Sequence, residues 1–131
     1  MKKAVAILFC AVFLFAFVSC GNLKPSNTSD AMYQLGLNAL AVADEYIAGK
    51  ITDDEAESRI EKIYNQAEIQ EEAEKEELGT DTLSGTKYAN DYYISLSIYL
   101  LRFDIMGAKY GYKPLSEVIE GRDKLADELG K

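Results

Sequence analysis

The side chains of this chain that could do chemistry are mainly carboxylates and tyrosines. Among 131 residues there are 22 Asp and Glu, nine Tyr, two Cys and no His. Without histidine the chain lacks the commonest general base and metal ligand. It also has no G-x-S-x-G, P-loop or G-x-G-x-x-G pattern. We therefore expect that the protein is not an enzyme; catalysis would need a deep cleft that gathers acids with Arg102 or Lys109.

One segment has the length of a calcium-binding loop. Residues 44–55, DEYIAGKITDDE, put Asp44 at position 1, Gly49 at position 6 and Glu55 at position 12 of an EF-hand loop. Positions 3 and 5, however, are a tyrosine and an alanine, whereas calcium takes about 6 to 8 oxygen ligands. Helix caps explain the same residues, because Gly49 can end one helix and Thr52 with Glu55 can start the next. We expect no metal ion here or elsewhere.

Carboxylates also recur at helical spacing. Glu57 lies four residues after Asp53 and four before Glu61. Paired carboxylates can do acid–base work when their surroundings separate their pKa values. On an exposed helix they are only solvated, and Arg59 and Lys62 are available as ion-pair partners. We expect the second arrangement.

Tyrosine is concentrated in one segment, since six of the nine lie between residues 88 and 112. A tyrosine joins a large apolar area to a hydroxyl and is enriched at recognition surfaces. The possible ligand or partner surface consists of Tyr88, Tyr92, Tyr93, Tyr99 and Tyr112. The alternative, which we favour, is that Tyr88, Tyr92 and Tyr99 pack inside the fold. In that case Tyr93 and Tyr112 are the better surface candidates.

The elements that position these residues are helices. Apolar residues recur at three- and four-residue spacing, and no useful length of strand-like alternation follows residue 22. The first helix should begin near Ser29 or Asp30 and end at Gly49. The second should begin with a capping box from Thr52 to Glu55 and end at Gly79. From residue 68 this helix is so rich in glutamate that we expect a solvated end that frays.

The third helix, residues 88–110, should be the buried one because it is apolar over most of its circumference. One stripe is rich in aromatic residues, and an adjacent stripe contains Ile94, Ile98, Leu101 and Ile105. Arg102 and Asp104 interrupt this helix and should mark its narrow exposed strip. A fourth helix follows Pro114. The fold class is therefore all-α, a small antiparallel bundle of four helices, or of three if the last one docks loosely.

The first twenty residues have the order of a secretory signal peptide. Lys2 and Lys3 precede an apolar run over residues 4–18, and Ser19 and Cys20 follow it. A membrane span needs roughly 17 to 25 apolar residues, so this run is slightly short for a permanent anchor. The sequence FVSC, residues 17–20, resembles a bacterial lipobox, with Val18, Ser19 and Cys20 on the pattern and Phe17 in place of the usual leucine.

The lipobox resemblance implies cleavage before Cys20 and a diacylglyceryl group on its thiol. Residues 1–19 would be the signal peptide, residues 20–28 a lipidated tether and residues 29–131 the helical domain. The protein would be exported and anchored to a bacterial membrane by lipid, with its folded domain outside the cytoplasm. We expect no cofactor apart from this covalent lipid.

Charge limits the partners of the mature chain. Loss of Lys2 and Lys3 takes the formal net charge from −8 to −10, which disfavours nucleic acid and anionic lipid headgroups. Membrane contact is then expected through the anchor alone. We expect a small acidic cell-envelope lipoprotein that acts as a membrane-tethered protein-interaction module for another envelope protein. The alternative is a small-ligand-binding lipoprotein with a tyrosine-lined pocket between helices.

Overall fold

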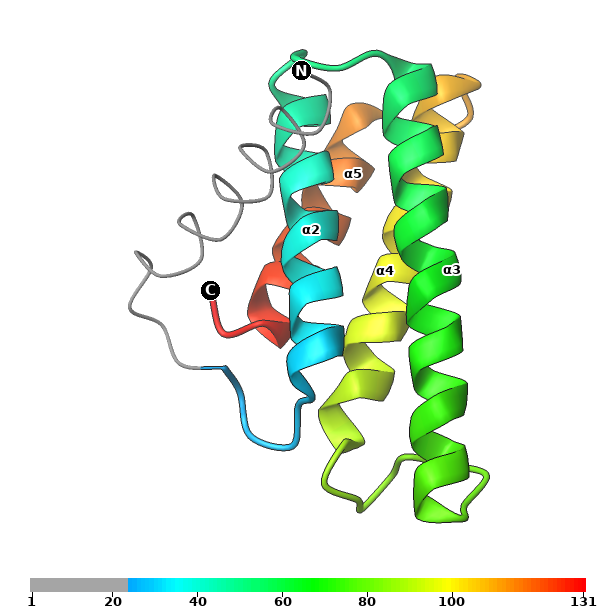
Figure 1. The fold of residues 1–131 in the computed structure, drawn as a ribbon. Helices are drawn as coiled ribbons and strands as arrows, with labels where there is room; N and C mark the ends of the chain where they lie inside the picture. The colour runs from blue at the N-terminus through cyan, green and yellow to red at the C-terminus, as the bar shows by residue number, and fades with distance from the viewer. Residues whose placement is uncertain (1–23) are drawn as a thin grey trace, which may run out of the picture.

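The fold is a bundle of four helices. The computed structural model describes residues 24–131, so the predictions for the signal peptide and Cys20 lie outside the described residues. The helices are α2 (Asp30–Ile47), α3 (Asp53–Leu78), α4 (Ala89–Lys109) and α5 (Leu115–Glu128) (Figure 1). Residues 24–131 contain no strand. The predicted all-α bundle is confirmed, with four helices rather than three.

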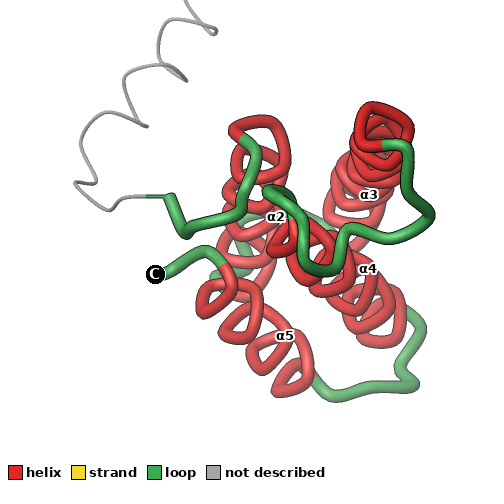
Figure 2. Tube along the Cα trace, turned by 90° about the horizontal axis from the view of Figure 1, so that it is seen from below, coloured by secondary structure: helices red, strands yellow, loops and turns green. Residues whose placement is uncertain are grey.

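Two of the helices form the centre of the bundle. Helices α2 and α4 pack against each other, and each also contacts both α3 and α5. Helices α3 and α5 do not contact each other; they lie on either side of the α2–α4 pair (Figure 2). Of the helices in the described part of the chain, none is both long enough and apolar enough to span a membrane.

Local sequence explains where the first two helices begin and end. The Ser29 hydroxyl accepts a hydrogen bond from the Met32 amide and caps α2. At the start of α3, the Thr52 hydroxyl accepts from the Glu55 amide at 3.2 Å while the Glu55 carboxylate accepts from the Thr52 amide at 2.8 Å. Helix α3 ends at Gly79, whose φ of 64° is a left-handed conformation that glycine adopts without strain. These predicted caps are confirmed.

The core selects one of the two apolar stripes of α4. The fully buried apolar side chains of α4 are Ile94, Ile98, Leu101 and Ile105. The stripe that contains Tyr92 faces outward instead, and Tyr92 is 47% exposed. The expectation that Tyr92 packs inside is therefore wrong. The branched aliphatic stripe faces the other helices, so the aromatic stripe is left on the outside.

The glutamate-rich end of α3 is helical and has one buried glutamate. The helix continues to Leu78, and within this end Glu74 is buried. Lys75 forms an ion pair with Glu71 at 2.8 Å one turn earlier. Most residues of this end are exposed, as expected of a solvated extension, and the difference from the expectation is that Glu74 packs inside the bundle.

Residues before α2 also lie against the bundle. Asn27 accepts a hydrogen bond from the Asn90 amide at 3.0 Å through its carbonyl oxygen. The hydroxyl of Thr28, which is buried, accepts from the Asn90 side-chain amide at 2.9 Å. The same amide also donates to the Glu128 carbonyl at the end of α5. Part of the segment expected to be tether is thus attached to the fold.

Candidate functional site

The exposed side of α4 is an aromatic surface. We call the aromatic face the residues Tyr92, Leu96, Tyr99, Phe103 and Tyr110. They recur at four, three, four and seven residues, which places them on one side of the helix. Tyr92, Phe103 and Tyr110 are 47%, 44% and 56% exposed, and the other two are half-buried. This face is opposite the buried isoleucines.

Neighbouring rings hold the middle of the aromatic face in place. The Tyr99 and Phe103 rings meet edge to face, with centroids 4.9 Å apart and an interplanar angle of 73°. Tyr64 of α3 lies 5.5 Å from Tyr99. Edge-to-face and tilted pairs of this kind are the arrangements that aromatic rings favour. The surface is therefore partly preorganised before anything binds to it.

An arginine joins the aromatic face to α3. The Arg102 guanidinium lies 4.9 Å from the centroid of the Tyr64 ring and 5.6 Å from that of Phe103. Its Nε and Nη2 atoms bind the two carboxylate oxygens of Glu61, Nη2 at 3.2 Å. The prediction that Arg102 marks an exposed strip of the helix is wrong, because its side chain is only 20% exposed and is paired with Glu61.

In the first half of α3, the carboxylates of Asp54, Glu57 and Glu61 bind cations of α4. Lys109 forms ion pairs with Glu57 and with Asp54, the latter at 2.9 Å. These carboxylates raise the pKa of the Lys109 ammonium. Arg59 binds Glu45 of α2 instead of a carboxylate on its own helix. The expectation that Glu57 and Glu61 are merely solvated is therefore wrong.

On the α5 side, the border of the aromatic face is also charged. Asp104 binds Lys113 at 2.8 Å, and Lys113 binds Glu117 at 3.0 Å. The Asp104 side chain is largely covered, so it too differs from the exposed strip that we expected. A Cβ atom at Gly121 would lie 2.6 Å from the Asp104 carboxylate, which shows how closely α5 approaches α4 here.

The structure separates the five predicted tyrosines. Tyr92 and Tyr99 belong to the aromatic face, and the Tyr93 ring lies beside it, 5.4 Å from Tyr92. Tyr88 is at the N-cap position of α4, where its side chain makes no capping hydrogen bond, and its hydroxyl lies 3.4 Å from a Glu77 carboxylate oxygen. Tyr112 lies in the turn after α4 and is 86% exposed. Sequence reasoning did not single out Phe103 and Tyr110 as site residues, although their spacing from Tyr92 and Tyr99 was visible.

Tyr64 extends the aromatic surface onto α3 with a fixed hydroxyl. Its hydroxyl donates to Glu68 at 2.6 Å. This hydrogen bond, with some burial, raises the pKa of Tyr64 to about 12. The hydroxyl therefore keeps its proton at neutral pH, and Glu68 leaves a carboxylate at the edge of the surface.

In residues 44–55, the segment with the length of a calcium-binding loop, the first and last carboxylates bind groups of the protein itself. The Asp44 carboxylate binds Arg122 of α5 at 2.7 Å. Glu55 completes the capping box of α3. Across residues 24–131 there is no group of three or more His, Cys, Asp or Glu side chains placed to hold a metal ion.

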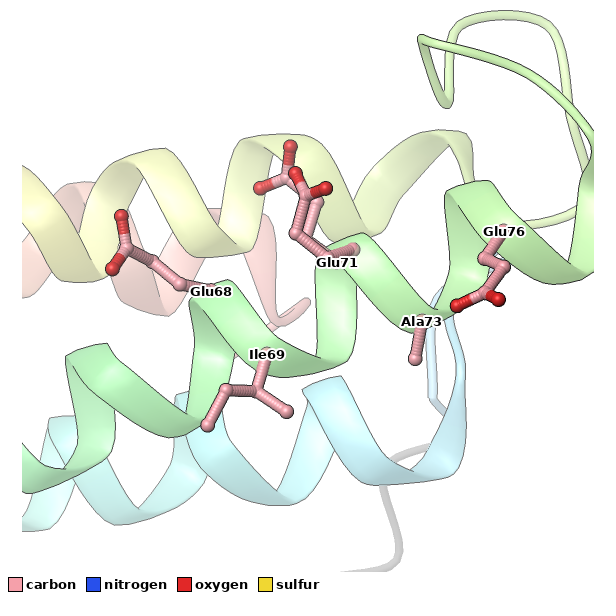
Figure 3. A pocket seen from close by; sticks show the side chains of 6 residues that line it. Glu68, Ile69, Glu71, Ala73 and Glu76 are labelled. Carbon is pink, nitrogen blue, oxygen red and sulfur yellow. The ribbon is translucent and has the colours of Figure 1, made fainter.

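One surface depression is acidic and belongs to a single helix. It is lined by Glu68, Ile69, Glu71, Glu72, Ala73 and Glu76, all from α3. Figure 3 shows the carboxylates of Glu68 and Glu71 on one side of the helix and Ile69 and Ala73 on the other. A second depression continues to Asp81, and a third is lined by residues between Ile51 and Arg59. None of these three is lined by a tyrosine.

The fold and this surface define a small acidic all-α bundle with an aromatic outer face on α4. The chain matches no protein-family model, no curated protein and no solved structure. Its function therefore has to be argued from its own residues.

Proposed function

We propose that the protein is a small cell-envelope lipoprotein that acts as a membrane-tethered protein-interaction module. The observation that carries the interaction role is the aromatic face, because large apolar side chains lie exposed side by side on an otherwise acidic molecule. Extended apolar patches on soluble domains mark interaction sites. The proposed tether is a diacylglyceryl group on Cys20, which would anchor the exported domain to a bacterial membrane.

The arrangement of the aromatic face suits a protein partner. Aromatic side chains at the centre with charged residues around them are the usual anatomy of a protein–protein interface. Here the centre contains Phe103 and Tyr99, and the surrounding ion pairs are those of Arg102 and Lys113. Partly buried aromatic rings of this kind are the residue types that dominate binding energy.

Charge defines the proposed partner further. Lys113, on the α5 side, is already shared by Asp104 and Glu117. Glu68, on the α3 side, accepts the hydrogen bond of the Tyr64 hydroxyl and forms no ion pair with a residue of 24–131. The full chain has a net charge of −8. We therefore propose an envelope protein that presents apolar anchors flanked by Lys or Arg, and not a nucleic acid.

The alternative of a tyrosine-lined ligand pocket has less support. Tyr99 packs against Tyr64 and Phe103, and the three depressions described above are lined by other residues. An enzymatic role has less still, because the cations Arg102 and Lys109 are engaged in ion pairs with carboxylates of α3.

Photo-crosslinking in native membranes tests the interaction role. A photo-reactive phenylalanine analogue at position 103 should give one discrete protein adduct. The same analogue at position 41, an exposed position on α2, is the matched control and should not give that adduct. Adding Tyr110→Ala to the position-103 protein should reduce the adduct severalfold.

Two results would contradict the proposal. Equal adducts at positions 41 and 103 would show that the aromatic face is not selective. Adducts with lipid alone at position 103 would show that this face lies against the bilayer and not against a protein.

A further inference from the structure

A buried pair of carboxyl groups lies where three helix ends meet. Helix α2 begins, α3 ends and α4 begins at the same end of the bundle (Figure 1). There Asp91 is 0% exposed and Glu74 is 2% exposed. Burying a charged group is costly unless it is paired and hydrogen-bonded. The bonding of each carboxyl group therefore determines its protonation state.

Asp91 has the surroundings of an ionised carboxylate. Its Oδ1 accepts from the Ser29 amide at 2.9 Å, and its Oδ2 accepts from the Ser29 hydroxyl at 2.6 Å. Asp91 also lies in the first turn of α4, where the helix dipole favours negative charge. Ser29 in turn caps α2, so this one carboxylate links the beginnings of two helices.

Glu74 lacks what an ionised carboxylate needs. Its Oε1 accepts from the Gln70 side-chain amide at 2.8 Å, but its Oε2 is buried with no donor. Burial, followed by the neighbouring Asp91 carboxyl group, raises the pKa of Glu74 to about 7. A proton on Oε2 would give this oxygen a hydrogen to donate to Asp91, and the missing bond would be supplied.

Within residues 24–131, none of the groups that shift the pKa of Glu74 is a cation. The titratable group of α4 that faces Glu74 is Asp91. The Ser29 hydroxyl faces Glu74 from the start of α2. On its own helix the facing group is the neutral Gln70 amide. Lys75, the next residue on α3, is paired with Glu71 and Glu72, and Lys87 is paired with Glu77.

We propose that Glu74 holds a proton shared with Asp91, and that release of this proton loosens the end of the bundle at which residues 24–29 attach. Ionised Glu74 would repel Asp91 across a dry contact, since two carboxylates sharing a site cannot both ionise cheaply. Displacement of Asp91 would break both hydrogen bonds that Ser29 donates to it and so release the residue that caps α2. It would also disturb the neighbouring Asn90, which holds Asn27 and Thr28.

The sign of the pH dependence follows from the raised pKa of Glu74. The proton on Glu74 stabilises this end of the bundle fully at a pH below 4.5, the pKa of this carboxyl group in the unfolded chain. The stabilisation is lost as the pH rises to about 7, the pKa in the folded protein. Above that pH the effect should level off. This device opens at neutral to alkaline pH and closes in acid, opposite to a carboxylate held by an ion pair.

One consequence rests on the proposed lipid anchor. If Cys20 is lipidated, the closed state leaves a short connection between the membrane and Lys24. Each further residue released from the bundle adds up to about 3.5 Å to that connection. Proton release would then let the domain, with its aromatic face, stand further from the membrane.

Glu74→Gln is the direct test, because a glutamine can donate to Asp91 and accept from Gln70 without titrating. The full chain in detergent micelles is followed by amide hydrogen exchange, corrected for intrinsic rates. In the wild type, protection of the Met32 and Asn90 amides should fall as pH rises from 4.5 to 7. Because the pKa of Glu74 is raised from 4.5 to about 7, protection of these amides can fall by at most roughly 300-fold.

The controls are another amide of the same protein and another glutamate of the same helix. In Glu74→Gln the protection of the Met32 and Asn90 amides should not change with pH. The amide of Glu55, in the capping box at the opposite end, should show no such change in either protein. Glu76→Gln, an exposed glutamate on the same helix, should behave as the wild type does.

A second measurement covers the case in which Glu74→Gln folds poorly. Carbon-13 shifts of the Glu74 carboxyl group, assigned by the signal missing in the variant, should titrate near pH 7. A midpoint in the usual range for glutamate would overturn the proposal. So would a midpoint that moves with added Ca²⁺ or Mg²⁺, which would assign the pair to a cation. Neither readout requires the lipid, so failure of the anchor would leave this result standing.

Discussion

Helix α4 contains two regions in which the usual distribution of side chains is reversed. Along its outer side, Tyr92, Phe103 and Tyr110 are about half exposed, although a phenylalanine usually lies inside and a tyrosine is usually partly covered. At its first turn Asp91 is fully buried, although carboxylates usually lie outside. The buried carboxylate is hydrogen-bonded within the fold, whereas the exposed rings leave half of their area unused. The region around buried Asp91 therefore stabilises the bundle, and the aromatic face is free to bind.

The largest expected effect is at the buried region. Asp91→Ala removes the acceptor of both Ser29 hydrogen bonds and leaves buried donors without partners. We expect a loss of about 2 to 4 kcal/mol in the free energy of unfolding. Urea denaturation at pH 5 measures it. Asp127→Ala, at an exposed position of α5, should change stability by less than about 0.5 kcal/mol; similar losses in both variants would contradict the role of Asp91.

The helix cap at Ser29 should contribute more to stability than the helix cap at Thr52. Ser29→Ala removes both a cap and a donor to buried Asp91, whereas Thr52→Ala removes only a cap at the exposed end of α3. We expect about 2 kcal/mol for the first and about 1 kcal/mol for the second. Thermal and urea unfolding should rank them in this order. If Thr52→Ala were the more destabilising, the linkage through Asp91 would be unimportant.

The smallest effect on stability is expected at the aromatic face. Tyr110→Ser should change the free energy of unfolding by less than about 1 kcal/mol, because the side chain is 56% exposed. The same variant should weaken the photo-crosslink from position 103 severalfold. A large loss of stability with an unchanged crosslink would reverse the assignment and make this face structural.

Local signals predicted much of the fold. The capping box of Thr52 and Glu55 and the glycine at position 79 act through neighbouring residues, so their pattern is readable in the sequence. Both stripes of α4 have helical spacing, however, and only the packing of α2, α3 and α5 decides which one is buried. Spacing could therefore identify the helix but could not place Tyr92 outside.

The polar interior was beyond sequence reasoning for a similar reason. Glu74 stands in a run of glutamates that looks solvated, and nothing in the run distinguishes it from its neighbours. Its environment comes from Asp91 and Ser29, which are distant in the sequence. The partners of Glu57 and Glu61 are likewise on another helix, where i, i+4 rules do not reach.

The intact mass of the protein extracted from membranes tests the proposed function most directly, because tethering is its central claim. Removal of residues 1–19 from 131 leaves 112 residues. We expect the mass of this chain plus a diacylglyceryl group. A Cys20→Ala variant should remain unprocessed or be released from the membrane. A full-length mass, or a mature chain without lipid in the soluble fraction, would contradict the proposed function.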